Sequence, residues 1–319
     1  MVQSNAVKKF FWVKKFLDNS VKFNENIVSI ILKYYWNLLS DKKKILKDWI
    51  SIDDLDLETL NLNYNAIDFF IDNPDKICLN VICQNENPKI LQLLENINIP
   101  DNSEIWFSIS KNPSLINIIE RNLDKIDWYS LSENSNAIKL LEKNRDKIDW
   151  YQIALNPNAI SIIEKNLEKI DWSILSKNEN AIDLLKSNPH NIDWQSISQN
   201  ENAINLLMEN PISIDWEYLS LNSNALLLIN DKINEEQLLN NEQFQLLNEK
   251  NKIDYCYLCL NTNPRIIEIL EKYPDKINWE MLSQNSVGIN LLEKNKEKIN
   301  YELLSLNPEI FTDEPIPNY

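Results

Sequence analysis

Tryptophan recurs every 22 residues through the centre of this 319-residue chain, and an asparagine follows each of these tryptophans six residues later. One copy reads IDWYQIALNPNAISIIEKNLEK, and the next reads IDWSILSKNENAIDLLKSNPHN. The positions with this spacing are Trp106, Trp128, Trp150, Trp172, Trp194 and Trp216. A fixed period of this length is the signature of a repeat architecture, in which neighbouring units share one core.

The same phase continues on both sides of the central block, where other residues take the Trp position. Leu57 and Leu79 occupy it before the block, and Glu235, Tyr255, Trp279 and Tyr301 occupy it afterwards. Asn follows each of them at the same distance, so the pattern predicts about twelve units between residues 52 and 311. The spacing slips between 79 and 106 and between 216 and 279, which predicts loop insertions or shortened helices there.

Each unit has the pattern of two short helices. Asn156 is a favourable N-cap, and Pro157 suits the first position of the helix that follows. We expect Asn166 to end this helix in the left-handed conformation that Gly usually supplies, because the chain has a single Gly. Asp149 is expected to cap the second helix, which starts at Trp150.

Helices this short cannot bury an apolar face alone, but stacked neighbours can. The predicted fold is therefore all-α: an elongated, curved α-solenoid of about twelve 22-residue two-helix repeats with an N-terminal helical cap. The predicted repeat core, lying inside the array between units, is formed by Trp106, Trp128, Trp150, Trp172, Trp194, Trp216 and Trp279.

The chain divides into three segments on this pattern: residues 1–50, the array over 51–311, and a tail over 312–319. The first segment has ten Lys and four acidic residues, a net charge of +6, and it lacks the repeat. Helices are expected over 7–18, 25–39 and 42–50. The tail contains two prolines, and we expect it to be an extended, docked peptide.

Two roles remain open for residues 1–50. One is a cap that covers the first unit, as the ends of solenoids require. The other is a basic, aromatic docking element for a membrane surface, an acidic protein or nucleic acid. The candidate docking residues are Phe10, Phe11, Trp12, Lys14 and Lys15.

Composition argues against catalysis, so we expect no enzyme, no cofactor and no metal. One Gly excludes glycine-dependent phosphate loops, and one His excludes multi-histidine metal sites. His190 falls at a variable turn position of the repeat. Cys259 takes the place of the small Ser found in other units, and Cys256 takes the place of Tyr129. The aspartates that precede Trp are better explained as helix caps than as acid–base pairs.

The chain has a net charge of −16, and removing the +6 of residues 1–50 leaves −22 on the remainder. Direct nucleic-acid binding by the array is therefore not expected, because phosphate backbones repel such a surface. No signal peptide and no transmembrane segment are predicted, so the chain is not expected to be secreted. No small-molecule substrate is indicated.

The repeat resembles the short Asn/Ile/Lys-rich repeats found in proteins of giant nucleocytoplasmic DNA viruses, mimivirus relatives in particular. The similarity is carried by residues 132–144 and 147–150, SENSNAIKLLEKN and KIDW, and by their copies. It covers about four fifths of the chain, and residues 1–50 and the units around 235–261 depart from it. The resemblance implies a virus-encoded, non-enzymatic repeat protein.

The favoured function is a scaffold for protein–protein interaction, as a virion component such as a minor capsid protein, with capsid proteins among its partners. The alternative is a soluble virus-encoded adaptor that binds a host protein, or an acidic decoy for basic surfaces. Either version places the chain in the virion or in the cytoplasm of the infected host.

Overall fold

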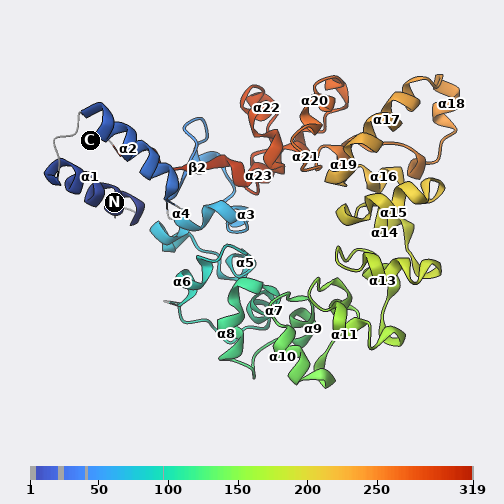
Figure 1. Cartoon of the computed structure of the whole chain (residues 1–319), viewed down its shortest axis with the longest axis horizontal. Helices are drawn as coiled ribbons and strands as arrows, with labels where there is room; N and C mark the ends of the chain where they lie inside the picture. Colours follow the sequence, from blue (N-terminus) through green and yellow to red (C-terminus); the bar gives the residue numbers. More distant parts are fainter. Residues whose placement is uncertain (1–4, 21–24, 40–41, 96, 318–319) are drawn as a thin grey trace.

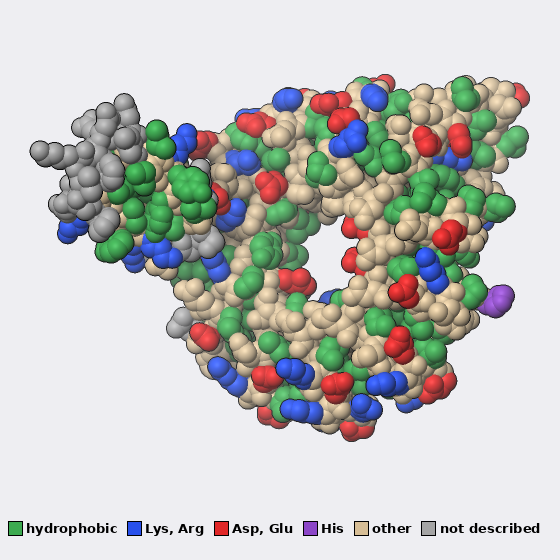
Figure 2. Space-filling model, viewed as in Figure 1, with side chains coloured by type: hydrophobic (Ala, Val, Ile, Leu, Met, Phe, Trp, Pro, Cys, Tyr) green, Lys and Arg blue, Asp and Glu red, His purple; other side chains and the backbone are tan. Residues whose placement is uncertain are grey.

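The computed structural model describes residues 5–20, 25–39, 42–95, 97–317. These residues confirm the predicted all-α class, because they form 23 α-helices and only two strands of three residues each. Most helices are four to six residues long. From α3 onward they follow one another around a central opening, which passes through the molecule in the space-filling view (Figures 1 and 2).

Two rows of helices build this ring (Figure 1). The helices that start at or near the Trp position form the first row, and α5, α7, α9, α21 and α23 of this row border the opening. Its members are α3 (Leu57–Leu60), α5 (Leu79–Ile82), α7 (Ser103–Lys111), α9 (Trp128–Glu133), a 3-10 turn (Gln152–Leu155), α12 (Trp172–Leu175), α14 (Trp194–Ser198), α16 (Trp216–Leu219), α19 (Tyr255–Leu258), α21 (Trp279–Gln284) and α23 (Tyr301–Leu304).

The second row follows the asparagines, and α6, α8, α10, α20 and α22 of this row lie on the outside (Figure 1). Its members are α4 (Ile67–Asp72), α6 (Ile90–Leu94), α8 (Ile116–Glu120), α10 (Ile138–Lys143), α11 (Ile160–Ile163), α13 (Ile182–Lys186), α15 (Ile204–Glu209), α17 (Leu226–Gln237), α20 (Ile266–Leu270) and α22 (Ile289–Glu293). A 3-10 turn (Pro308–Ile310) takes this place after α23, and further short 3-10 turns join the rows.

Buried asparagines link each unit to the one before it. The Asn156 amide donates to the carbonyls of Ser132 and Asn134, at 3.0 and 2.8 Å, and its Oδ1 accepts from the backbone N–H of Asn158 at 3.0 Å. All donors and one acceptor of the side chain are thus satisfied without water. The same pattern holds at eleven positions, which we call the rung asparagines: Asn63, Asn85, Asn112, Asn134, Asn156, Asn178, Asn200, Asn222, Asn261, Asn285 and Asn307.

The array closes on itself, which corrects the expectation of an open, elongated stack. The Asn63 amide donates to the carbonyls of Ser305 and Asn307, both at 2.8 Å, as every other rung asparagine does to its predecessor. The backbone N–H of Asp56 donates to Ser305 Oγ at 2.9 Å, which matches the bond from Asp149 to Ser132 Oγ. Leu60 and Leu304, both fully buried, belong to one continuous core cluster. The first unit therefore packs on the last.

One predicted unit does not join this cycle. The spacing of the repeat predicted a unit with Glu235 at the Trp position and Asn241 as its rung asparagine. Instead, the amide of Asn261 donates directly to the carbonyls of Ser220 and Asn222, so no rung lies between them. The intervening residues form the long helix α17, the short helix α18 (Asn241–Gln245) and a return to Asp254. This segment is an insertion, and the cycle contains eleven rungs where twelve units were expected.

The helix ends also differ from the prediction. None of the described residues has a positive φ, so Asn166 does not end its helix in the left-handed region. It has φ −145°, and its side-chain amide donates to the Ile162 carbonyl at 2.9 Å. The predicted Asp caps are confirmed, since Asp149 accepts from the N–H of Gln152 at 2.9 Å. Asparagine therefore closes these helices through its side chain.

The first two helices form an element with a core of its own. Two of the three expected helices are present, as α1 (Asn5–Ser20) and α2 (Glu25–Leu38), and they pack as a hairpin with its own small core that includes Phe10 and Trp36. The helix expected over 42–50 is wrong: β1 (Lys44–Leu46) lies there and pairs antiparallel with β2 (Phe311–Asp313) of the tail. The tail is extended, as expected, and Ile316 packs on the hairpin.

The last unit of the ring, and not the hairpin, covers the first unit's rung. Among the described residues up to Ile50, only Leu46, Trp49 and Ile50 appear with the ring's core. Residues 318–319 of the predicted tail lie outside the described residues.

Candidate protein-binding surfaces

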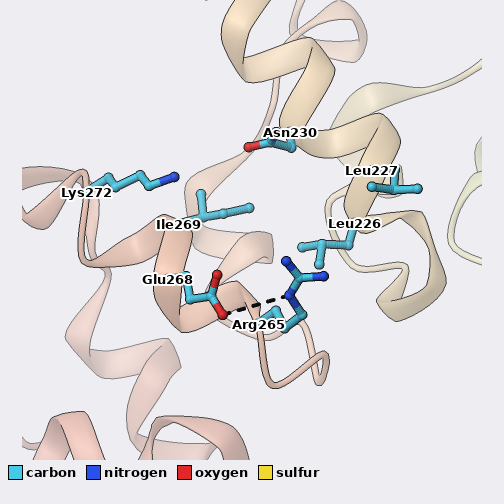
Figure 3. A pocket seen from close by; sticks show the side chains of 7 residues that line it. All are labelled: Leu226, Leu227, Asn230, Arg265, Glu268, Ile269 and Lys272. Carbon is cyan, nitrogen blue, oxygen red and sulfur yellow. Dashed lines mark ion pairs between the residues drawn. The ribbon is translucent and has the colours of Figure 1, made fainter.

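One of the surface pockets, between α17 and α20, is small and holds no catalytic arrangement (Figure 3). Its volume is about 150 Å³, and Leu226, Leu227 and Ile269 supply its apolar lining. Arg265 Nε lies 3.8 Å from Glu268 Oε1, and both side chains are largely exposed. Ligand pockets typically measure 300–1,000 Å³ and bury most of their ligand, so this pocket does not indicate a small-molecule site.

The residues considered for chemistry are dispersed around the ring. His190 is exposed in a turn on the outer edge of the molecule, where Figure 2 shows it alone. Burial raises the pKa of the Cys83 thiol to about 12 and that of Cys259 to about 11. Among the described residues, no group of three His, Cys, Asp or Glu side chains is placed to hold a metal ion.

The Trp row lies at the edge of the core. Trp106 is buried, but the other six predicted core tryptophans are only partly buried, although all pack against the main cluster. The fully buried positions instead carry aliphatic side chains, such as Leu131 and Ile153. Lysines cover several of the indole faces: Lys169 Nζ lies 4.4 Å from the ring centre of Trp150, and Lys147 lies 4.6 Å from that of Trp128. The Trp row thus joins units through packing and cation–π contacts.

The residue directly after each Trp position points away from the core. In α9, Leu131 and Ser132 are fully buried, whereas Tyr129 is 46% exposed. Helix α9 itself borders the opening (Figure 1), and Tyr129 lies on its exposed side. We call this the wall position, and around the ring it is Glu58, Asn80, Phe107, Tyr129, Tyr151, Ser173, Gln195, Glu217, Cys256, Glu280 and Glu302.

The wall position divides the ring into two contrasting arcs. Three consecutive units carry exposed aromatic rings, at Phe107, Tyr129 and Tyr151, with 45–48% of each side chain exposed. We call these the aromatic arc. Four of five consecutive units, running through the point of closure, carry glutamate: Glu217, Glu280, Glu302 and Glu58. We call these the acidic arc. Sequence reasoning missed both, although the position could be read from the repeat as the residue following Trp.

Negative charge is concentrated at one end of the acidic arc. Partial burial, and then the neighbouring carboxylates of Asp215 and Asp254, raise the pKa of Glu217. Tyr218 and Tyr257 from adjacent units lie with ring centres 5.6 Å apart beside it, and Tyr218 raises the pKa of Tyr257. These shifts indicate that a cation placed here would be stabilised.

The predicted docking residues of the N-terminal hairpin do not share one environment. Phe10 is fully buried, and its ring meets Trp36 edge to face at 5.5 Å between centres. Lys14 is partly buried, whereas Lys15 is exposed. Phe11 and Trp12 are exposed, by 36% and 68%. The far side of α2 adds an exposed apolar stripe that was not singled out, formed by Ile30, Tyr34 and Leu38 at i, i+4 and i+8.

Comparisons with protein-family models, with curated proteins and with solved structures found no match to this chain. The helices that the structure describes include none that is both long and apolar enough to span a bilayer.

Proposed function

We propose that the chain is a non-enzymatic scaffold: a closed α-solenoid that binds another protein through the wall of its opening. The observation that supports this is the contrast between neighbouring positions in the inner row. Positions two and three residues beyond the wall position are fully buried in every unit and hold the ring together. The wall position makes none of the rung bonds, and its side chains are sorted by type into two arcs.

A solenoid that displays a variable residue at one fixed position presents a binding surface built from many units. The exposed aromatics add to this, since Tyr is enriched where proteins meet. The resemblance to giant-virus repeats supports the finer proposal that the ring is a virion component, such as a minor capsid protein, with capsid proteins as partners. The alternative remains a soluble adaptor or decoy that binds a host protein.

Affinity capture tests the general proposal. The full chain, immobilised, is incubated with virion and infected-cell extracts, and captured proteins are quantified by mass spectrometry. A triple variant, Phe107→Ser, Tyr129→Ser and Tyr151→Ser, is the comparison, and Tyr64→Ser, a 50% exposed tyrosine outside the wall position, is the control. We expect specific partners that the triple variant loses and the control keeps. Capture of no protein, or equal capture by all three, would refute the proposal.

A further inference from the structure

The opening is wide enough to admit one α-helix. Eleven inner segments spaced 8–10 Å apart give a circle of axes about 30 Å across, and subtracting one helix diameter leaves about 20 Å. An α-helix with its side chains is about 10–12 Å wide. A double-stranded nucleic acid is disfavoured on charge, because the acidic wall would repel its phosphates.

The two arcs face each other across this space. The aromatic arc is centred on Tyr129, and the acidic arc is centred near Glu280. Six units separate them in one direction and five in the other, so in an eleven-unit ring they lie on opposite walls. An occupant therefore meets an apolar, π-rich surface on one side and negative charge on the other.

Lysines cover the rings of Tyr255 and Trp279, one residue before the wall position, but none occupies the wall position itself. Lys111, near the aromatic arc, is paired with Glu133 of the adjacent unit at 3.2 Å. The wall position itself carries four glutamates and no Lys or Arg. The raised pKa of Glu217 agrees with this surplus of negative charge, because burial and neighbouring carboxylates oppose its ionisation.

We propose that the opening binds a basic amphipathic α-helix of a partner protein, with its apolar face on the aromatic arc and its Lys/Arg face on the acidic arc. The inference rests on the proposed function and narrows the partner to one chemistry. Charge complementarity selects a basic occupant, and the segregation of the arcs selects one whose apolar and cationic side chains lie on opposite faces.

A labelled helical peptide tests this directly with the full chain. The probe is an 18-residue peptide with Leu on one helical face and Lys on the other, and binding is followed by fluorescence anisotropy at about 0.15 M salt, where distant charges are screened. A peptide of the same composition in shuffled order is the first control. We expect the amphipathic peptide to bind at least about tenfold more tightly than the shuffled one, because only it can address both arcs at once.

Matched variants locate the site. Glu280→Gln with Glu302→Gln, and separately Tyr129→Ser with Tyr151→Ser, should each weaken binding at least about fivefold. The control for the acidic arc is Glu293→Gln with Glu297→Gln, which removes the same charge from exposed positions of the outer row and the turn that follows it. The control for the aromatic arc is Tyr64→Ser, which removes one exposed ring. Each control should change the affinity less than about twofold. Circular dichroism melting confirms that each variant is folded.

Equal affinity for the shuffled peptide, or equal weakening by the outer and wall variants, overturns the inference. The absence of any peptide binding overturns it as well. None of these three results bears on whether the wall captures a protein of another chemistry, which the affinity capture measures separately. Failure of the capture experiment alone would refute the proposed function.

Discussion

Replacing Asn156 with alanine should destabilise the ring by about 3 kcal/mol. The side chain caps the following turn through Asn158, and losing an N-cap costs about 1 kcal/mol. It also bonds to the buried carbonyls of Ser132 and Asn134. After the substitution, the Asn134 carbonyl still accepts a hydrogen bond from the backbone N–H of Ala137, at 3.0 Å. The carbonyl of Ser132 loses its donor in a dry interface, which costs a further 1–3 kcal/mol.

Asn158→Ala is the matched control, since the same residue type lies two positions further on. Its amide donates to the Ser135 carbonyl at 2.9 Å in an exposed setting, where water replaces the bond, so the expected loss is below about 1 kcal/mol. Asn156→Asp is the second comparison. It keeps the acceptor but places a carboxylate against two carbonyl oxygens, which raises the pKa of the new carboxyl in the folded state. Its folded state is therefore favoured below the unfolded pKa of about 3.9 and disfavoured as the pH rises above it.

Urea unfolding followed by tryptophan fluorescence measures these differences, as shifts of the midpoint at equal slope. Asn156→Ala should unfold at clearly lower urea than Asn158→Ala, and Asn156→Asp should gain stability as the pH is lowered from 7 to 5. If Asn156→Ala and Asn158→Ala had the same midpoint, the rung bonds would contribute nothing net. The account of what holds neighbouring units together would then be wrong.

Four further outcomes are expected. Asn63→Ala should cost as much as Asn156→Ala in urea unfolding, because closure makes the first rung an interior one; an open array would tolerate the change as fraying at one end. Leu131→Ala, at a fully buried site, should cost about 3–4 kcal/mol, whereas Trp150→Ala at a partly buried site should cost about 2 kcal/mol, and equal losses would contradict the burial pattern. Hydrogen bonds from Lys42 and Lys44 lower the pKa of Asp313, so the stability that Asp313 adds to the strand pair is present above its unfolded pKa and is lost as the pH falls through the lowered value. Asp313→Asn should speed hydrogen exchange in residues 44–46 and 311–313 at pH 7, and the difference in exchange rate from the original chain should become smaller in acid. A thiol reagent should modify Cys256 first and reach Cys83 and Cys259 only in urea, and prompt reaction of all four cysteines would show that the ring opens readily.

The local structure of the ring could be predicted from the sequence because it is fixed by single residues. Asn156 and Asp149 each offer an oxygen to a free N–H of the next turn, and both do so in the structure. The 22-residue spacing identified which residues become neighbours, and the amide of each central rung asparagine reaches the asparagine 22 residues earlier. The sequence pattern predicted that the Trp row is buried inside the core, but most of these side chains lie at its edge. A large side chain can occupy a regularly repeated apolar position and still be only partly buried.

The insertion before Asp254 shows where spacing alone fails. Glu235 and Asn241 kept the expected phase, but Glu236 Oε1 instead accepts the backbone N–H of Ile253 at 2.8 Å, and this bond returns the chain to the ring. Burial raises the pKa of the Glu236 carboxyl, while the Ile253 N–H opposes that rise. This carboxylate holds the returning loop together with Ser220 Oγ, which accepts from the Asp254 N–H at 3.1 Å, and the 22-residue period does not predict the Glu236 contact.

Closure depends on a quantity that no single residue encodes. Eleven units complete a circle only if each turns by about 33° relative to the last, and this rotation follows from the summed packing of many side chains. A systematic change of a few degrees per unit would leave the ends apart and expose the Asn63 rung. Since closure leaves no end unit, the ring does not need the hairpin to cover it. The wall position makes none of the rung bonds, so its side chain can differ from unit to unit without breaking the ring.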